Sequence, residues 1–193
     1  MRQLIAIALT TLLGGAGCGD GQEYDTELAG IYELTSWTHN PDGCAEEGPE
    51  VADTSNTHFF VRSDEFLGVL FVAMSWCRGL DECRSWSANY DTVFPSGFRF
   101  DAGGDADGWT GHDTEMTEGG GDGTCEGEVR RATLTGTAGR AVRIEEETMT
   151  VGGVPTDDRD LCDEELAFEK ADQSPCEQLT VVTGSYFEPL ATR

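Results

Sequence analysis

The sequence has almost no lysine, since Lys170 is the single one in a chain of 193 residues. Only 12 Lys+Arg stand against 37 Asp+Glu, which gives a formal net charge of -25 at pH 7. Proteins that bind nucleic acid contact the phosphates with clustered Lys and Arg. Because no such cluster exists here, we expect no nucleic-acid partner.

The usual motifs of catalytic and metal-binding sites are also missing. There is no Cys-x-x-Cys, and His39, His58 and His112 do not stand at zinc-binding spacing. A Gly-x-Ser-x-Gly elbow and a glycine-rich loop followed by lysine are both absent. Carboxylates are so numerous that a close pair of them does not indicate a catalytic pair. The sequence therefore predicts a protein that is not an enzyme and has no cofactor.

A long hydrophobic run is absent as well, but the N-terminus carries a short one. Arg2 precedes ten apolar or small residues, Leu4 to Leu13, a length typical of a signal peptide and too short to cross a bilayer. The run leads into Gly14-Gly15-Ala16-Gly17-Cys18, which resembles the lipobox of bacterial lipoproteins. Gly15 departs from that pattern, in which leucine is usual.

The resemblance implies that residues 1–17 are removed and that Cys18 is lipidated and anchors the chain to a membrane. Gly19, rather than Asp, follows the cysteine, which in this family favours the outer membrane of the cell envelope. The alternative is an ordinary secretory peptide cleaved near Ala16. We expect a lipidated N-terminus and tether over 18–27, followed by one β domain over 28–193.

Cysteine usage agrees with export. Seven cysteines become six without Cys18, and thiols outside the cytoplasm form disulfides by default. Six cysteines allow many pairings, which the sequence alone does not distinguish. The positions of the cysteines at predicted strand ends favour Cys77–Cys83 and, if 125–170 is a meander, Cys125–Cys162. Cys44 then pairs with Cys176.

Short segments rich in β-branched and aromatic residues alternate with turns along the whole domain. Helical periodicity is poor, and its best example, 161–170, could equally be a strand. We expect strands at 30–38, 56–62, 66–76, 84–91, 97–101, 108–116, 124–136, 140–151, 164–170 and 178–187. This pattern predicts an all-β fold, either an antiparallel up-and-down barrel or a β-sandwich. The glycine-rich, acidic segment 101–124 is interpreted as a mobile excursion that contains one short strand.

The first predicted strand carries a second resemblance. Leu28 to Trp37 is similar to the opening strand of lipocalin-like domains, which have a Gly-x-Trp signature where this chain has Gly30-x-Tyr32. The resemblance implies an up-and-down barrel with a central cavity or a packed interior. Candidate residues lining a pocket for a small apolar ligand are Tyr32, Trp37, Trp76 and Trp86, although large aromatics also simply fill cores.

One further segment has the residue types of a calcium site. Asp105, Asp107, Asp113 and Glu115 offer alternate carboxylates, the hard oxygen ligands that Ca²⁺ prefers, although their spacing is not that of an EF-hand. A solvated acidic loop is the alternative. We therefore expect a lipid-anchored envelope protein that binds a small apolar ligand. The alternatives are a structural or protein-interaction lipoprotein and a calcium-binding module.

Overall fold

The described part of the chain forms one antiparallel sheet and two short helices. A computed structural model describes residues 26–51, 54–66, 69–89, 97–119, 123–156 and 161–190. The strands are β1 (Gly30–Asn40), β2 (His58–Phe66), β3 (Val69–Cys77), β4 (Gly97–Phe100), β5 (Ala102–Gly104), β6 (Gly108–Gly119), β7 (Thr124–Thr137), β8 (Ala141–Pro155) and β9 (Gln178–Glu188). The helices are α1 (Leu80–Ala88) and α2 (Glu164–Ala171).

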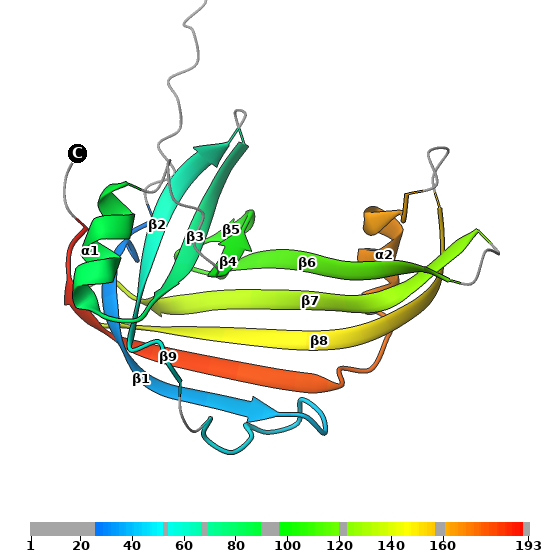
Figure 1. Ribbon diagram of the computed structural model, residues 1–193, viewed down its shortest axis with the longest axis horizontal. Coiled ribbons are helices and arrows are strands. Elements are labelled where there is room, and N and C mark those ends of the chain that lie inside the picture. The colour runs from blue at the N-terminus through cyan, green and yellow to red at the C-terminus, as the bar shows by residue number, and fades with distance from the viewer. Residues whose placement is uncertain are drawn as a thin grey trace, which may run out of the picture.

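The sheet is an up-and-down meander joined through its first and last strands. Its order is β4-β3-β2-β1-β9-β8-β7-β6-β5, and every neighbouring pair of strands is antiparallel. Figure 1 shows the long strands β6 to β9 lying side by side, with the β2–β3 hairpin rising from one end of them. The predicted all-β antiparallel fold is confirmed.

The two edges of the sheet are linked directly by the chain, which almost closes the barrel. β4 and β5 are the outermost strands, yet only Asp101 lies between them in sequence. The Asp101 N–H donates a hydrogen bond of 3.0 Å to the carbonyl of Thr110 on β6. One bent segment therefore pairs with β3 before Asp101 and with β6 after it.

Glycine is required where this closing segment crosses β6. A Cβ at Gly111 would collide with the carbonyl oxygen of Arg99 and lie 3.0 Å from the Cα of Phe100. Both groups are backbone and cannot rotate away. The close approach of β4 to β6 thus depends on a missing side chain.

We expect Gly111→Ala to lower the free energy of unfolding by about 1–3 kcal/mol, because the added methyl group forces the closing segment away from β6. Urea unfolding followed by circular dichroism measures this change. Gly104→Ala is the matched control, since a Cβ there meets nothing within 4 Å, and it should change stability by less than about 0.5 kcal/mol. Equal losses in the two variants would contradict a tight seam at Gly111.

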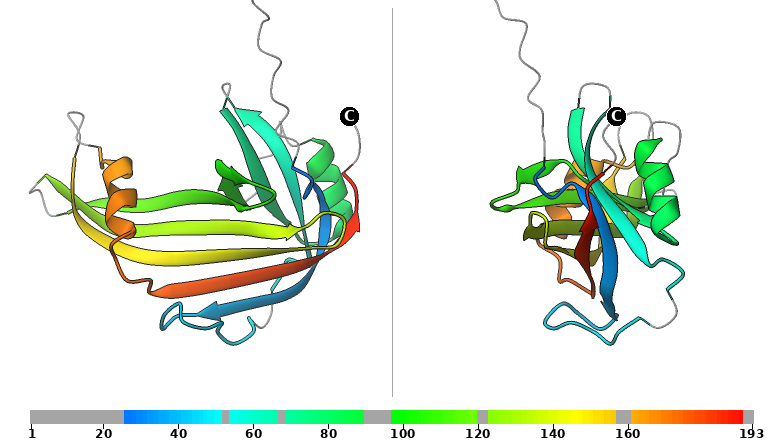
Figure 2. Two further views of the ribbon diagram at one scale, coloured as in Figure 1. Left: turned by 180° about the vertical axis from the view of Figure 1, so that it is seen from behind. Right: turned by 90° about the vertical axis from the view of Figure 1, so that its left-hand side faces the viewer.

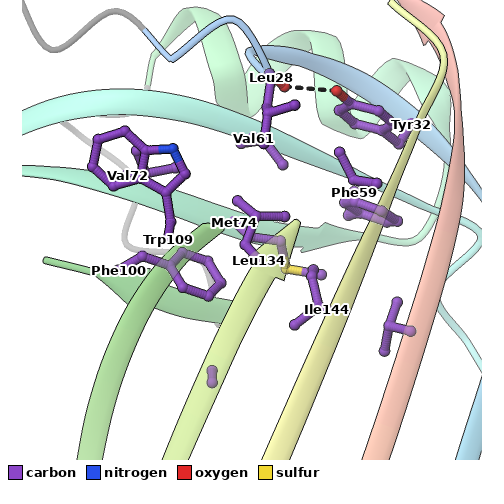
Figure 3. Close-up of a cluster of buried hydrophobic side chains, with 13 residues drawn as sticks. Leu28, Tyr32, Phe59, Val61, Val72, Met74, Phe100, Trp109, Leu134 and Ile144 are labelled. Carbon is purple, nitrogen blue, oxygen red and sulfur yellow. Dashed lines mark hydrogen bonds between the residues drawn. The ribbon is translucent and has the colours of Figure 1, made fainter. Parts of the chain in front are cut away.

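The largest apolar core fills the end of the barrel where the segment through Asp101 joins the two edges of the sheet, which we call the closed end. Tyr32, fully buried, stacks on Phe59 with ring centroids 5.4 Å apart, and its hydroxyl donates to the carbonyl of Leu28 at 2.7 Å. Burial, with a smaller contribution from Tyr186, raises the pKa of the Tyr32 hydroxyl above its usual value. Figure 3 shows Leu28 and Tyr32 above side chains of the sheet, including Trp109 and Leu134. The interior of this end is packed.

Two smaller apolar clusters lie on the opposite face of the sheet and involve the helices. α2 packs Ala167 and Ala171 against Val129, Met149 and Val151 of β7 and β8. The second cluster places α1 and its neighbours beside strands β1, β2 and β3, with buried Ile31, Phe60, Cys77 and Cys83. Figure 2 shows the two helices at opposite ends of the molecule.

The two helices correct two expected strands, since α1 forms at the strand expected at 84–91 and α2 at the strand expected at 164–170. The first difference has a local cause. Asp81 and Glu82 occupy the first turn of α1, where carboxylates stabilise a helix N-terminus. Cys83 bonds Cys77 only six positions earlier, so the chain must fold back within that interval. The segment 84–91 was expected to be a strand because α1, with 9 residues, is too short to show a clear helical periodicity in the sequence.

The acidic segment 101–124 is also corrected. It holds β5 and β6, and β6 pairs with β7 over eleven consecutive positions, from Trp109–Leu134 to Gly119–Thr124. Its glycines and carboxylates suggested an excursion, but cross-strand pairing with a regular neighbour overrides weak β propensity.

Three disulfides tie the strands together in the pairs expected from strand-end positions. Cys77–Cys83 links β3 to α1, Cys125–Cys162 links β7 to the segment before α2, and Cys44–Cys176 joins the loop after β1 to the start of β9. Cys18, the predicted lipidation site, lies outside the described residues. No helix within the described ranges is both long and apolar enough to cross a membrane.

Candidate binding cavity

A cavity of about 380 Å³ opens beside the packed end of the barrel, where β4 approaches β6. It is lined by residues of four strands: Gly97, Phe98, Arg99, Gly111, His112, Asp113, Arg130, Ala132 and Glu146. A space of this size holds a small organic molecule.

One wall of the cavity is apolar and continuous with the core. Phe98 is partly buried against the main apolar cluster, to which Ala132 belongs. The ring of Phe98 lies 6.3 Å from that of Phe100, measured between centroids. A ligand resting on this wall would extend the hydrophobic core of the barrel.

The charged part of the lining is organised around Arg130 on β7. Its guanidinium contacts three carboxylates, at 2.7 Å for Glu115, 3.6 Å for Glu128 and 3.7 Å for Asp113. Each of these carboxylates is partly exposed, so each pair contributes little alone. Together, the three carboxylates surround the guanidinium of Arg130 and fix its position.

Glu146 enters the cavity from β8. It pairs across the sheet with Ala132, and its strand neighbours Ile144 and Thr148 are buried on the same face. Within the described residues it makes no hydrogen bond or ion pair. Burial raises the pKa of Glu146, Arg130 opposes the rise, and Asp113 and Glu128 add to it, with a net upward shift.

The four aromatic residues predicted to line a ligand pocket do not meet in this cavity. Tyr32 is a fully buried core residue, because its ring fills the closed end of the barrel against Phe59. Trp86 lies on α1 and packs beside the cluster around Cys77 and Cys83. Neither lines the cavity, so the expectation of a wholly apolar pocket does not fit its lining.

Trp37 and Trp76 remain together on the inner side of the barrel. Their rings are parallel within 4° and 4.7 Å apart, and both pack against the main core. Trp37 also borders a separate cavity of about 310 Å³ between β1 and residues 50–57. Its stacked partner limits how much of the indole a ligand could reach.

The four predicted calcium ligands do not converge. Asp105 lies in the turn between β5 and β6 and Asp107 is exposed beside it, whereas Asp113 and Glu115 lie further along β6 and contact Arg130. Among the described residues, no group of three His, Cys, Asp or Glu side chains is arranged to hold a metal ion.

Asp105 instead fastens the start of the domain. Its Oδ1 accepts hydrogen bonds from the Thr26 hydroxyl and the Trp109 indole N–H, and its Oδ2 accepts one from the Glu27 N–H, all at 2.6 Å. Thr26 is 3% exposed. Thr26 and Glu27, which the sequence analysis assigned to the tether, therefore belong to the folded domain.

Asp105 should also make stability depend on pH. Its partial burial favours the neutral acid, but the three hydrogen bonds outweigh this and lower its pKa below the ordinary 3.8. A carboxyl with a lowered folded-state pKa stabilises the protein above the unfolded pKa and loses that contribution as pH falls through the folded value. We expect Asp105→Asn to cost about 1–3 kcal/mol at pH 7.

Urea unfolding of the wild type and Asp105→Asn at pH 7 and at pH 3 measures this effect. The difference between the two proteins should shrink at pH 3. Asp107→Asn, an exposed neighbour in the same turn, is the control and should leave stability unchanged at both pH values. A difference independent of pH would show that Asp105 acts through its shape rather than its charge.

Glu146 and Arg130 carried no signal of their own in the sequence. Glu146 is the central member of an acidic run, Glu145-Glu146-Glu147, and Arg130 is one of two adjacent arginines. The β7–β8 hairpin was nevertheless predicted, and counting back from its turn places Glu146 on the same face as the apolar residues Leu134 and Ile144. The position of Glu146, an acidic residue on an otherwise apolar face, was therefore the one signal in the sequence that could have indicated the site.

Comparison of the chain with protein-family profiles, with curated proteins and with solved structures finds no match.

Proposed function

We propose that this protein is an exported, lipid-anchored, non-enzymatic binding protein of the cell envelope, and that its barrel takes a small ligand. The observation that carries the binding function is the cavity beside the barrel core, whose lining combines apolar Phe98 and Ala132 with the carboxylate of Glu146. A ligand with both an apolar and a polar part suits such a lining. This replaces the purely apolar ligand suggested by the lipocalin-like opening strand.

The cellular part of the proposal rests on the N-terminal sequence. The short apolar run ending in Ala16-Gly17-Cys18 supports signal-peptide removal and acylation of Cys18, with the outer membrane as the destination. The three disulfides among the other cysteines are what an oxidising compartment favours. The acylated cysteine would hold the domain near the headgroups through the residues that precede Thr26.

Expression of the full chain in a Gram-negative host tests the anchor. The wild type should partition into detergent and show a mature N-terminus of acylated Cys18 by mass spectrometry. Cys18→Ser should lose both properties. An unmodified Cys18 in a cleaved, water-soluble wild type would favour the ordinary secretory peptide and reject the lipid anchor.

The cavity is tested separately by two-dimensional NMR of the disulfide-bonded domain, with a set of small aromatic fragments. We expect fragments to shift the amide resonances of Phe98 and Ala132. The filling variant Ala132→Leu, which should occupy the cavity, should abolish those shifts. Shifts that survive in Ala132→Leu, or none in the wild type, would reject the cavity as the binding site.

A further inference from the structure

Resting on that proposed function, we infer that the ligand of this cavity is an organic cation, an alkyl- or arylammonium ion whose charged group is bound by Glu146. This names the chemical class of the ligand. Three features of the cavity lead to it: a carboxylate without a hydrogen bond or close ion pair, a guanidinium that contacts three other carboxylates, and an aromatic side chain in the lining.

The first feature is the carboxylate of Glu146. It lies on the inner face of the barrel, between buried Ile144 and Thr148, and no described group donates a hydrogen bond to it or forms an ion pair with it. A half-buried carboxylate without a hydrogen-bond donor loses solvation, and the attraction of Arg130 compensates this only in part, since the pKa of Glu146 stays raised. An ammonium group in the cavity would supply both the opposite charge and hydrogen-bond donors.

The second feature is the state of the arginines, which argues against an anionic ligand. Arg130 is held by Glu115, Glu128 and Asp113, so an anion would have to compete with three carboxylates. The guanidinium of Arg99 lies over the ring of Phe71, 4.3 Å from its centroid, and is thus engaged elsewhere. Four carboxylates, those three and Glu146, stand against the two guanidiniums of Arg99 and Arg130, which makes the local field negative.

The third feature is Phe98. Its ring borders the same cavity as Glu146 and continues into the apolar core. An aromatic face attracts a cation and also accepts an apolar ligand body. A cation with a hydrocarbon or aromatic portion would contact both the carboxylate and the apolar residues of the lining, whereas a bare metal ion would leave the apolar residues exposed.

The test uses three probes that share one ring system and differ in charge: 1-naphthylmethylamine, 1-naphthalenemethanol and 1-naphthoate. Binding to the disulfide-bonded domain at pH 7 is followed by NMR titration at the amides of Phe98 and Ala132. We expect the amine to bind at least tenfold more tightly than the alcohol, and the naphthoate more weakly than the alcohol.

Two variants locate the charge that matters. Glu146→Gln keeps the size of the side chain and should reduce the preference for the amine over the alcohol to less than about threefold, as expected when one charged partner is removed. Glu115→Gln removes an equal charge that contacts Arg130 outside the lining, so it should keep most of the preference. Unchanged melting temperatures of both variants establish that they fold.

The outcomes separate the two proposals. If the alcohol binds as well as the amine, or if Glu146→Gln keeps the preference, the cation inference is wrong while a binding cavity remains. If naphthoate binds best, Arg130 is available and the inference is likewise overturned. If none of the probes shifts Phe98 or Ala132, the proposed function itself fails.

Discussion

Removing the Cys44–Cys176 disulfide should destabilise the protein more than removing either of the other two. The bridge spans 132 positions in sequence, against 37 for Cys125–Cys162 and 6 for Cys77–Cys83. If a disulfide acts mainly by restricting the unfolded chain, these spans correspond to about 5, 4 and 2 kcal/mol respectively.

Unfolding of the three double Cys→Ala variants in guanidinium chloride measures two quantities: the free energy of unfolding, and the slope with which it depends on denaturant concentration. Removing a long cross-link lets the unfolded chain expand, so that dependence should rise most for Cys44→Ala/Cys176→Ala. This second readout is needed because Cys77 and Cys83 are fully buried, and their truncation also loses packing. Equal slopes in all three variants would contradict an effect through the unfolded chain.

Phe59→Ala should be among the most damaging single substitutions in the barrel. Phe59 is fully buried between the rings of Tyr32 and Trp76, at centroid distances of 5.4 and 5.9 Å. Truncation of a buried phenylalanine leaves a cavity and costs about 3–5 kcal/mol. Urea unfolding of the variant measures this loss.

Phe187→Ala is the control for Phe59→Ala, because Phe187 is 48% exposed and has an edge contact with His58. Its loss of stability should stay below about 1 kcal/mol. A small effect of Phe59→Ala, comparable to that of Phe187→Ala, would mean that the closed end of the barrel is not packed around this ring.

The fold was predictable from the sequence where local signals agree with the sheet. The β7–β8 hairpin has a turn at Thr137-Ala138-Gly139, and Gly139 adopts the positive φ of 64° that such a turn favours. Alternating burial along β7 and β8 then follows from the strand period. In these strands the pattern, the turn chemistry and the tertiary structure all indicate the same arrangement.

Features set by distant contacts were not predictable. β6 has too many glycines and acids to be recognised as a long strand, and it becomes one by pairing with β7. Asp105 has the residue type of a cation ligand, but its partners Thr26 and Glu27 are nearly eighty positions away in sequence. The cavity likewise arises only when β4 crosses β6, which no local pattern of residues specifies.

The link between β4 and β5 through Asp101 has a consequence for how the chain reaches its native state. The hairpin of β2 and β3 and the meander of β6 to β8 are each built from neighbours in sequence. Two connections join them: the segment through Asp101, which pairs with β3 and with β6, and the long-range pairing of β1 with β9 from Ile31–Glu188 onward. Contacts between such distant segments form slowly, on a scale of about milliseconds to seconds. The ring of strands therefore cannot be completed until β9, which follows β8 and α2 in sequence, has been synthesised, and until then β1 presents an open edge to other chains.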